Sequence, residues 1–311
     1  MSLDRHAHRL LRMLAMAPPS PTVRDVAERR RGLEQLRAIA EAEPEPGLEV
    51  QDISLPGPGG ALDARLYQTE NQDQSGPLLL YFHGGGWVAG GLETHDGVCR
   101  RLALASACAV LSLDYRLAPE HPFPAAIEDG LAAFAWVVAN AEALGADPDQ
   151  IGLAGDSAGA GIAAAVAQTL AQSAGRQPKL LLLICPILDV SRESPSRREF
   201  AEGYFLDRDT LLADLADYAP SPTDLTDPRL SPLLAERLDA LPPVLVHTAQ
   251  FDPFRDEGQA FAGRLTQAGA SVRHTEHGGM IHYFYALTRA IPHGATVMTQ
   301  IGREVREILE R

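Results

Sequence analysis

Ser157 is the residue of this sequence best suited to act as a nucleophile. It lies at the centre of a Gly-Asp-Ser-Ala-Gly pentapeptide, 155–159, after an apolar run at 151–154 and before a stretch of small, helix-favouring residues at 160–170. This order predicts a strand, a sharp turn and a helix, the context in which the G-x-S-x-G pattern exposes a serine hydroxyl. We expect glycine on both sides, because a side chain there would clash with the neighbouring strand or helix.

A serine hydroxyl is a weak nucleophile at neutral pH, so it needs a base, an orienting acid and N–H donors for an oxyanion. The donors are predicted in the His-Gly-Gly-Gly stretch that begins at His83, directly after an apolar run at 78–82. Successive glycines let backbone N–H groups face a ligand. We expect Gly84 and Gly85 to donate, joined by Ala158 after the nucleophile. No Gly-Lys-Ser/Thr follows the glycines, which disfavours a phosphate-binding loop, and His83 is interpreted as structural.

The orienting acid is predicted at Asp252, just past an apolar strand expected at 243–250. Parallel sheets present their catalytic loops at the carboxyl ends of their strands, which favours this position. Asp256 and Glu257 are the nearby alternatives. Acidic residues in the first turn of a helix commonly interact with the helix dipole, so Asp252 is preferred.

Three histidines are candidates for the base. His274 falls inside a strand expected at 271–276, His277 is expected to end that strand, and His282 follows on a loop before a Phe- and Tyr-rich segment expected to be helical. A metal site made of the three is disfavoured, because they lack the His-x3-His spacing and an adjacent acidic ligand set. These observations leave the choice among the three histidines open.

The elements that must position these residues follow two patterns. Alternating apolar and polar residues at 49–55 and 61–68, around a Pro- and Gly-rich turn, predict an antiparallel pair of strands. Near-continuous apolar runs predict strands that are buried on both faces, and therefore an α/β fold with a mostly parallel sheet and helices on both faces. These runs lie at 78–82, 109–113, 151–154, 180–185 and 244–248.

Two segments are interpreted as parts of a helical cap. Two helical patterns precede every strand and end at a boundary marked by Pro44 and Pro46, and the interval 191–230, rich in Pro, Asp and Arg, interrupts the rhythm of strands and helices. We therefore divide the chain into N-terminal cap helices, 1–45, and a catalytic domain, 46–311, with 191–230 inserted as the second cap segment. Simple packing of the first helices onto the main domain is the alternative.

Composition limits the classes of partner and compartment. The chain has 311 residues and a formal net charge of −14, and it shows no cluster of Lys and Arg, which disfavours nucleic acid and anionic membranes as partners. Three scattered cysteines fit a reducing cytoplasm better than a disulfide framework or a zinc site. The first 17 residues lack the apolar run of a signal peptide. We expect a cytoplasmic protein without membrane insertion.

Several motifs, in order along the chain, resemble those of the bacterial hormone-sensitive-lipase-like family of α/β-hydrolase esterases. The matching stretches are 83–87, 114–126, 155–159, 252–258 and 279–282. They run from about residue 78 to 285 and so cover the whole catalytic core. The resemblance implies the α/β-hydrolase fold and its chain order of nucleophile, acid and histidine. It implies a triad of Ser157, Asp252 and His282, and it implies Gly84, Gly85 and Ala158 as oxyanion donors.

The same resemblance implies a carboxylesterase that hydrolyses short-chain acyl esters through an acyl-enzyme on Ser157, with no metal or organic cofactor. An amidase, deacetylase or lactonase with the same triad is the alternative. A non-catalytic small-molecule receptor on the same fold is a remote one, and it predicts a broken triad. Family members often dimerise through the last strand and helix, so a homodimer stays open for this chain.

Two residues depart from the family pattern. Tyr283 stands after the histidine, where members commonly have Gly, and Phe254 replaces the commoner Leu. We expect the Tyr283 ring to narrow the acyl pocket or to shift the loop. The sequence does not explain Asp156, which lies directly before the nucleophile.

Overall fold

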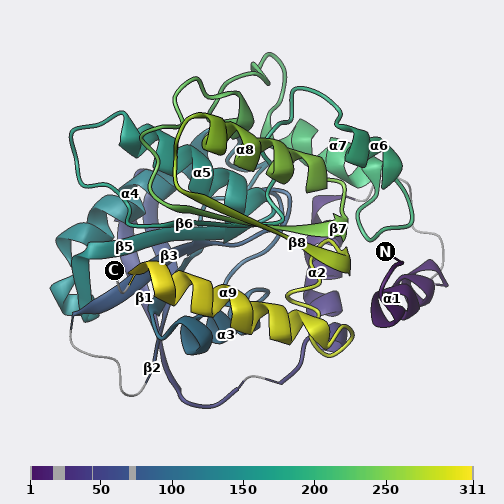
Figure 1. Ribbon diagram of the computed structural model, residues 1–311, viewed down its shortest axis with the longest axis horizontal. Coiled ribbons are helices and arrows are strands. Elements are labelled where there is room, and N and C mark those ends of the chain that lie inside the picture. Colours follow the sequence, from purple (N-terminus) through teal and green to yellow (C-terminus); the bar gives the residue numbers. More distant parts are fainter. Residues whose placement is uncertain (1, 17–24, 44, 70–74, 310–311) are drawn as a thin grey trace.

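The computed structural model describes residues 2–16, 25–43, 45–69 and 75–309 (Figure 1). The predicted boundary residue Pro44 lies outside this part of the chain. The strands are β1 (Leu48–Gly57), β2 (Gly60–Thr69), β3 (Gly76–Phe82), β4 (Ala109–Leu113), β5 (Ala146–Asp156), β6 (Leu181–Ile184), β7 (Val244–Phe251) and β8 (Val272–Ile281). The helices are α1 (Arg5–Ala15), α2 (Val26–Ala40), α3 (Asp96–Ser106), α4 (Ala125–Ala139), α5 (Ala158–Ala171), α6 (Pro195–Glu199), α7 (Arg208–Tyr218), α8 (Arg255–Gln267) and α9 (His293–Leu309), with 3-10 turns η1 (Glu142–Leu144) and η2 (Pro232–Leu234).

One eight-stranded sheet carries the fold, in the order β1-β2-β4-β3-β5-β6-β7-β8. β1 pairs with β2 and β2 with β4 in antiparallel fashion, and every later neighbour pair is parallel. The predicted antiparallel pair and the mostly parallel sheet are both confirmed. Parallel strands end at the same edge, so the loops after β3, β5, β7 and β8 meet there.

Helices cover both faces of the sheet (Figure 1): α4, α5 and α8 lie on one face and α3 and α9 on the other. The side chains of β3 alternate between two cores, as the pleat of a strand requires. Leu78, Leu80 and Phe82 belong to the core under α4 and α5, and Leu79 and Tyr81 to the core under α3 and α9. Burial on both faces explains why this strand is apolar at every position.

The segments interpreted as a cap make separate contacts. Arg29 of α2 forms ion pairs with Asp214 and Asp217 of α7. α1 instead lies beside the end of β8, where the N–H of Asp4 donates to the carbonyl oxygen of Gly279 at 2.9 Å. None of the helices in the described ranges combines the length and the apolar character that crossing a bilayer requires.

The region around His282 differs in part from the prediction. β8 does not end at His277 but continues to Ile281, so that His282 follows the strand directly. The Phe- and Tyr-rich segment after it forms turns rather than a helix, and the next helix, α9, begins at His293. The aromatic side chains of this segment are buried in the core under α3 and α9, and this packing holds the turns in place.

Candidate active site

Ser157 lies at the sharp turn between β5 and α5. Its backbone has φ 53° and ψ −120°, a region that non-glycine residues seldom adopt. This conformation costs free energy and persists only where the surrounding structure enforces it. Its N–H donates to the carbonyl oxygen of Ile184 in the neighbouring strand at 2.9 Å. A Cβ on Gly159 would overlap the carbonyl oxygens of Phe82 and His83. The expected need for glycine beside the serine is thus confirmed.

The loops after β5, β7 and β8 bring three predicted residues together. His282 Nε2 lies 3.0 Å from Ser157 Oγ, and His282 Nδ1 lies 2.7 Å from Asp252 Oδ2. The second oxygen of Asp252 accepts the N–H of Phe254 at 2.8 Å. All three side chains are buried. An unbroken chain of hydrogen bonds therefore runs from hydroxyl to imidazole to carboxylate.

The other two candidate histidines bond elsewhere. His277 Nε2 lies 3.2 Å from His247 Nδ1, and the two rings stack in the core. His274 Nε2 lies 2.9 Å from the hydroxyl oxygen of Thr248. Both partners belong to β7, so neither ring nitrogen faces Ser157. Of the three histidines, His282 is the one with a ring nitrogen next to Ser157 Oγ.

The alternative acids have structural partners too. Glu257 is buried and accepts the N–H groups of Leu188 and Asp189 at 2.8 and 3.0 Å, together with the guanidinium of Arg197 at 2.6 Å. Asp256 accepts the N–H of Ser196 at 2.9 Å. Both carboxylates hold the chain that follows β6 against α8, and neither reaches a histidine.

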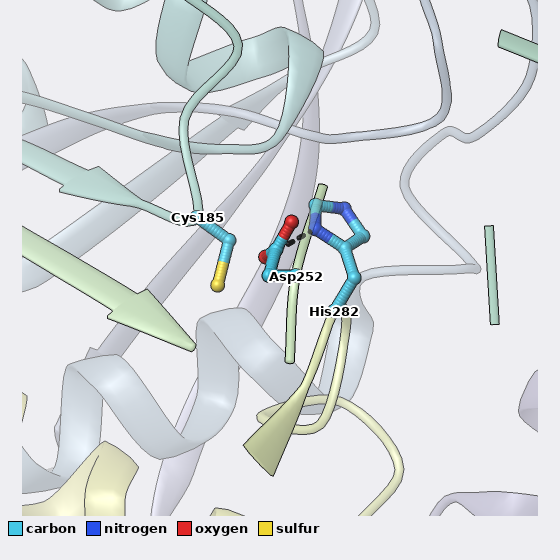
Figure 2. Close-up of side chains that lie close together, drawn as sticks. All are labelled: Cys185, Asp252 and His282. Atoms are coloured by element: carbon cyan, nitrogen blue, oxygen red, sulfur yellow. Dashed lines mark hydrogen bonds and ion pairs between the residues drawn. The ribbon is translucent and has the colours of Figure 1, made fainter. Parts of the chain in front are cut away.

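Cys185 lies beside the acid, as Figure 2 shows with Asp252 next to His282 and the hydrogen bond between them dashed. Potential ligand atoms of these three residues lie within 4.8 Å of one another, and within the described ranges this is the group of His, Cys, Asp and Glu side chains that could hold a metal ion. Burial, followed by the charge of Asp252, raises the pKa of the Cys185 thiol well above its usual range. A thiol that keeps its proton is a poor metal ligand.

The expected oxyanion donors need a correction. The N–H of Gly84 donates to Asp156 Oδ1 at 2.9 Å, so it is not free to bind an oxyanion, and the structure contradicts its predicted role. Within the part of the chain that the structure describes, the N–H groups of Gly85, Gly86 and Ala158 donate no hydrogen bond. Gly85 and Gly86 have φ 127° and 63°, which explains why this turn requires glycine. Gly86 is visible in the sequence as part of the same motif. The hydrogen bond that occupies the N–H of Gly84 is not.

Comparison with known proteins identifies the family to which the chain belongs. Residues 79–286 match the family described as having an alpha/beta hydrolase fold. The chain is 42% identical over 260 residues to the carboxylic ester hydrolase LipN of Mycobacterium tuberculosis, covering 81% of this chain and 69% of that protein. It belongs to the hormone-sensitive-lipase-like family of α/β-hydrolase carboxylesterases.

Two further relatives extend this similarity over nearly the whole chain. The carboxylesterase NlhH of Mycobacterium tuberculosis is 39% identical over 289 residues, covering 91% of this chain and 90% of that protein. The solved structure of the ester hydrolase EH1AB1 from the metagenome of Lake Arreo superposes with a TM-score of 0.96 at 41% identity, covering 99% of this chain and 100% of that one. The chain is accordingly a carboxylic ester hydrolase, which confirms the predicted family, fold and enzyme class.

A cavity of about 270 Å³ lies near the site of this carboxylesterase: its wall includes Ile187, whose N–H donates to the carbonyl oxygen of Ser157 at 3.1 Å. Its wall includes Trp87, directly after Gly86, and Phe254, whose ring meets that of His282 edge-on at 5.3 Å. Leu211 and Leu215 of α7 line the cavity as well.

The charged side chains in the wall of the cavity are paired. Arg197 binds Glu257 at 2.6 Å, Arg208 binds Glu193 at 3.1 Å, and Arg192 binds Asp189 at 2.7 Å. Neutralised charges around apolar side chains suit an uncharged, apolar ligand.

Tyr283 lies outside the wall of this cavity. Its hydroxyl donates to the carbonyl oxygen of Thr94 at 3.3 Å, and its ring stacks on that of Phe205 with centroids 6.0 Å apart. Its backbone has φ 65°, a conformation that glycine adopts at lower cost. The ring therefore does not narrow this cavity, whereas Phe254 does form part of its wall.

Proposed function

We propose that this carboxylesterase hydrolyses short-chain acyl esters through an acyl-enzyme on Ser157, with His282 as base and Asp252 as orienting acid. The observation that carries the proposal is the hydrogen-bonded series, 3.0 Å from Ser157 Oγ to His282 Nε2 and 2.7 Å from His282 Nδ1 to Asp252 Oδ2. A nucleophile in contact with a base that a third group orients is the arrangement that covalent catalysis needs.

The first half of the reaction forms the acyl-enzyme. As Ser157 Oγ attacks the ester carbonyl carbon, its proton passes to His282 Nε2, and the carbonyl oxygen becomes an oxyanion. The free N–H groups of Gly85, Gly86 and Ala158 are proposed to bind this oxyanion, the last of them at the N-terminus of α5, where the helix dipole also favours negative charge. The bond to the alcohol then breaks, and the alcohol leaves with the proton from His282.

The second half repeats these steps with water. A water molecule attacks the acyl carbon while His282 takes a proton from it. His282 then returns this proton to Ser157 Oγ as the bond between Oγ and the acyl carbon breaks and the acid leaves. Asp252 keeps the Nδ1 proton in place and stabilises the imidazolium that forms in each half. The bond from the N–H of Phe254 fixes the carboxylate for this task.

The preference for short acyl chains is supported by the size of the cavity whose wall includes Phe254, next to His282. At about 270 Å³ it is smaller than most sites for drug-sized ligands, which span about 300–1,000 Å³. Its apolar wall favours an alkyl group, and α7 closes it from the side of the proposed cap. We also propose that α2 and α7 act as two parts of this cap, since Arg29 pairs with Asp214 and Asp217.

The proposal is tested by Ser157→Ala on a series of p-nitrophenyl esters from acetate to dodecanoate. We expect the variant to keep its fold and to lose roughly 10⁴-fold or more in kcat. We expect the wild-type kcat/KM to be highest on the short esters. Retention of more than a few per cent of ester turnover would refute Ser157 as nucleophile, and a maximum at dodecanoate would refute the chain-length preference. Matched amides and lactones show whether another acyl donor is preferred.

A further inference from the structure

The carboxylate of Asp156, the residue before the nucleophile, is completely buried and bonded on both oxygens. Oδ1 accepts the hydroxyl of Tyr81 at 2.6 Å and the N–H of Gly84 at 2.9 Å. Oδ2 accepts the hydroxyl of Tyr285 at 2.7 Å and lies 3.4 Å from His95 Nε2. Burial of a charged carboxylate costs free energy, and the four partners of Asp156 offset this cost. An apolar side chain would fill the same space without this cost, so packing alone does not explain the residue.

The surroundings keep this group ionised. Burial alone would raise the pKa of Asp156, but the nearby His95 and the hydrogen bonds from Tyr81 and Tyr285 outweigh burial and lower the pKa to about 2. Hydrogen bonds to an ionised acceptor are stronger than bonds between neutral groups. Asp156 therefore holds its partners more firmly than a neutral side chain would.

These partners come from the separate segments that build the site. Gly84 begins the glycine turn after β3 that carries the free N–H groups of Gly85 and Gly86. Tyr285 lies three residues after His282 in the turns that follow β8. Asp156 itself is bonded covalently to Ser157. One carboxylate thus ties together the oxyanion turn, the histidine loop and the nucleophile.

We propose that Asp156 is a positioning residue that sets the glycine turn and the histidine loop relative to Ser157; this rests on the function proposed above. The N–H of Gly84 lies 2.9 Å from Asp156 Oδ1 and 3.2 Å from His95 Nε2. By accepting the shorter of these two bonds, Asp156 fixes the first peptide of the turn, so that the next two N–H groups face the reaction centre. Catalytic groups must be held within a fraction of an ångström, and loss of one oxyanion donor costs about 10²–10³ in kcat. Loss of Asp156 therefore lowers kcat, while KM stays nearly unchanged.

The experiment compares Asp156→Ala with Asp156→Asn. Asparagine can present its carbonyl oxygen to the N–H of Gly84, while its NH₂ group faces Tyr285, whose hydroxyl can rotate to accept. We expect Asp156→Ala to lower kcat about a hundredfold with KM within about threefold of wild type. We expect Asp156→Asn to recover part of that loss, because it restores an acceptor for Gly84 but not the charge that strengthens the bond.

A matched pair of tyrosine variants separates positioning from stability. Tyr285→Phe removes a buried hydroxyl that donates to Asp156, and Tyr67→Phe removes a buried hydroxyl that donates to Asp96 at 3.0 Å rather than to Asp156. We expect both to lower the free energy of unfolding, but only Tyr285→Phe to lower kcat, by about tenfold. This pair decides the question should Asp156→Ala fail to fold.

Binding of a reversible trifluoromethyl ketone, whose adduct with Ser157 mimics the oxyanion, gives a second readout. We expect Asp156→Ala to weaken it in proportion to the loss in kcat. A folded Asp156→Ala with unchanged kcat and ketone affinity, or equal effects of the two tyrosine variants on kcat, overturns the inference. If these variants keep activity while Ser157→Ala loses it, only this inference fails. If Ser157→Ala also stays active, the proposed function fails.

Discussion

His277 makes the stability of the folded chain depend on pH. Its side chain is buried, and its Nε2 lies 3.2 Å from His247 Nδ1. Burial, and then the charges of His293 and His274, lower its pKa from 6.5 to about 4. Between these two values the unfolded chain binds a proton that the folded chain excludes. The free energy of unfolding therefore falls as the pH drops below 6.5 and levels off, for this group, below about 4.

The size of this contribution follows from the two pKa values. A difference of one pKa unit corresponds to about 1.4 kcal/mol, so the full interval amounts to roughly 3 kcal/mol, of which about 2 kcal/mol is lost between about pH 7 and pH 4.5. His277→Gln removes this titration and keeps a polar side chain next to His247. Over this pH range, we expect the free energy of unfolding of the variant to fall by about 2 kcal/mol less than that of the wild type.

Urea unfolding, followed by circular dichroism at several pH values, measures this difference. Other buried groups titrate as well, so the quantity to compare is the difference between wild type and variant at each pH. Two curves that fall in parallel would refute the reasoning, because His277 would then bind its proton equally in both states. The variant also serves as a control for the base: we expect His277→Gln to keep its ester turnover near pH 7, since this ring does not face Ser157.

Two further substitutions follow from the packing around the site. Gly159→Ala places a Cβ against the carbonyl oxygen of Phe82. We expect this variant to lower the free energy of unfolding by about 1–3 kcal/mol in urea unfolding and to reduce kcat in ester assays. A variant as stable and as active as wild type would contradict the steric argument. Leu211→Trp fills part of the cavity. We expect kcat/KM for p-nitrophenyl octanoate to fall by about tenfold more than kcat/KM for the acetate. An equal loss on both esters would show that the acyl chain lies elsewhere.

The sequence by itself determined what depends on local patterns. Ser157 could be predicted as the nucleophile because a strand, a glycine-flanked serine and a helix are consecutive in the chain. The inner strands of the sheet, β3 to β7, could be predicted because burial on both faces leaves an apolar run at each of them. Asp252 could be preferred because its place just after a strand is itself a local signal.

Only the tertiary structure decided how distant segments converge. The sequence alone does not show which of His274, His277 and His282 lies beside the serine. The pairing of β8 with β7 places His274 next to Thr248 and His277 next to His247. His282, directly after β8, is the histidine that lies next to Ser157. The sequence favoured Gly84 as an oxyanion donor, but its N–H is taken by the carboxylate of Asp156, 72 positions later. Which donor stays free depends on contacts between segments far apart in the chain, because buried N–H groups take up whatever acceptors the packed fold places beside them.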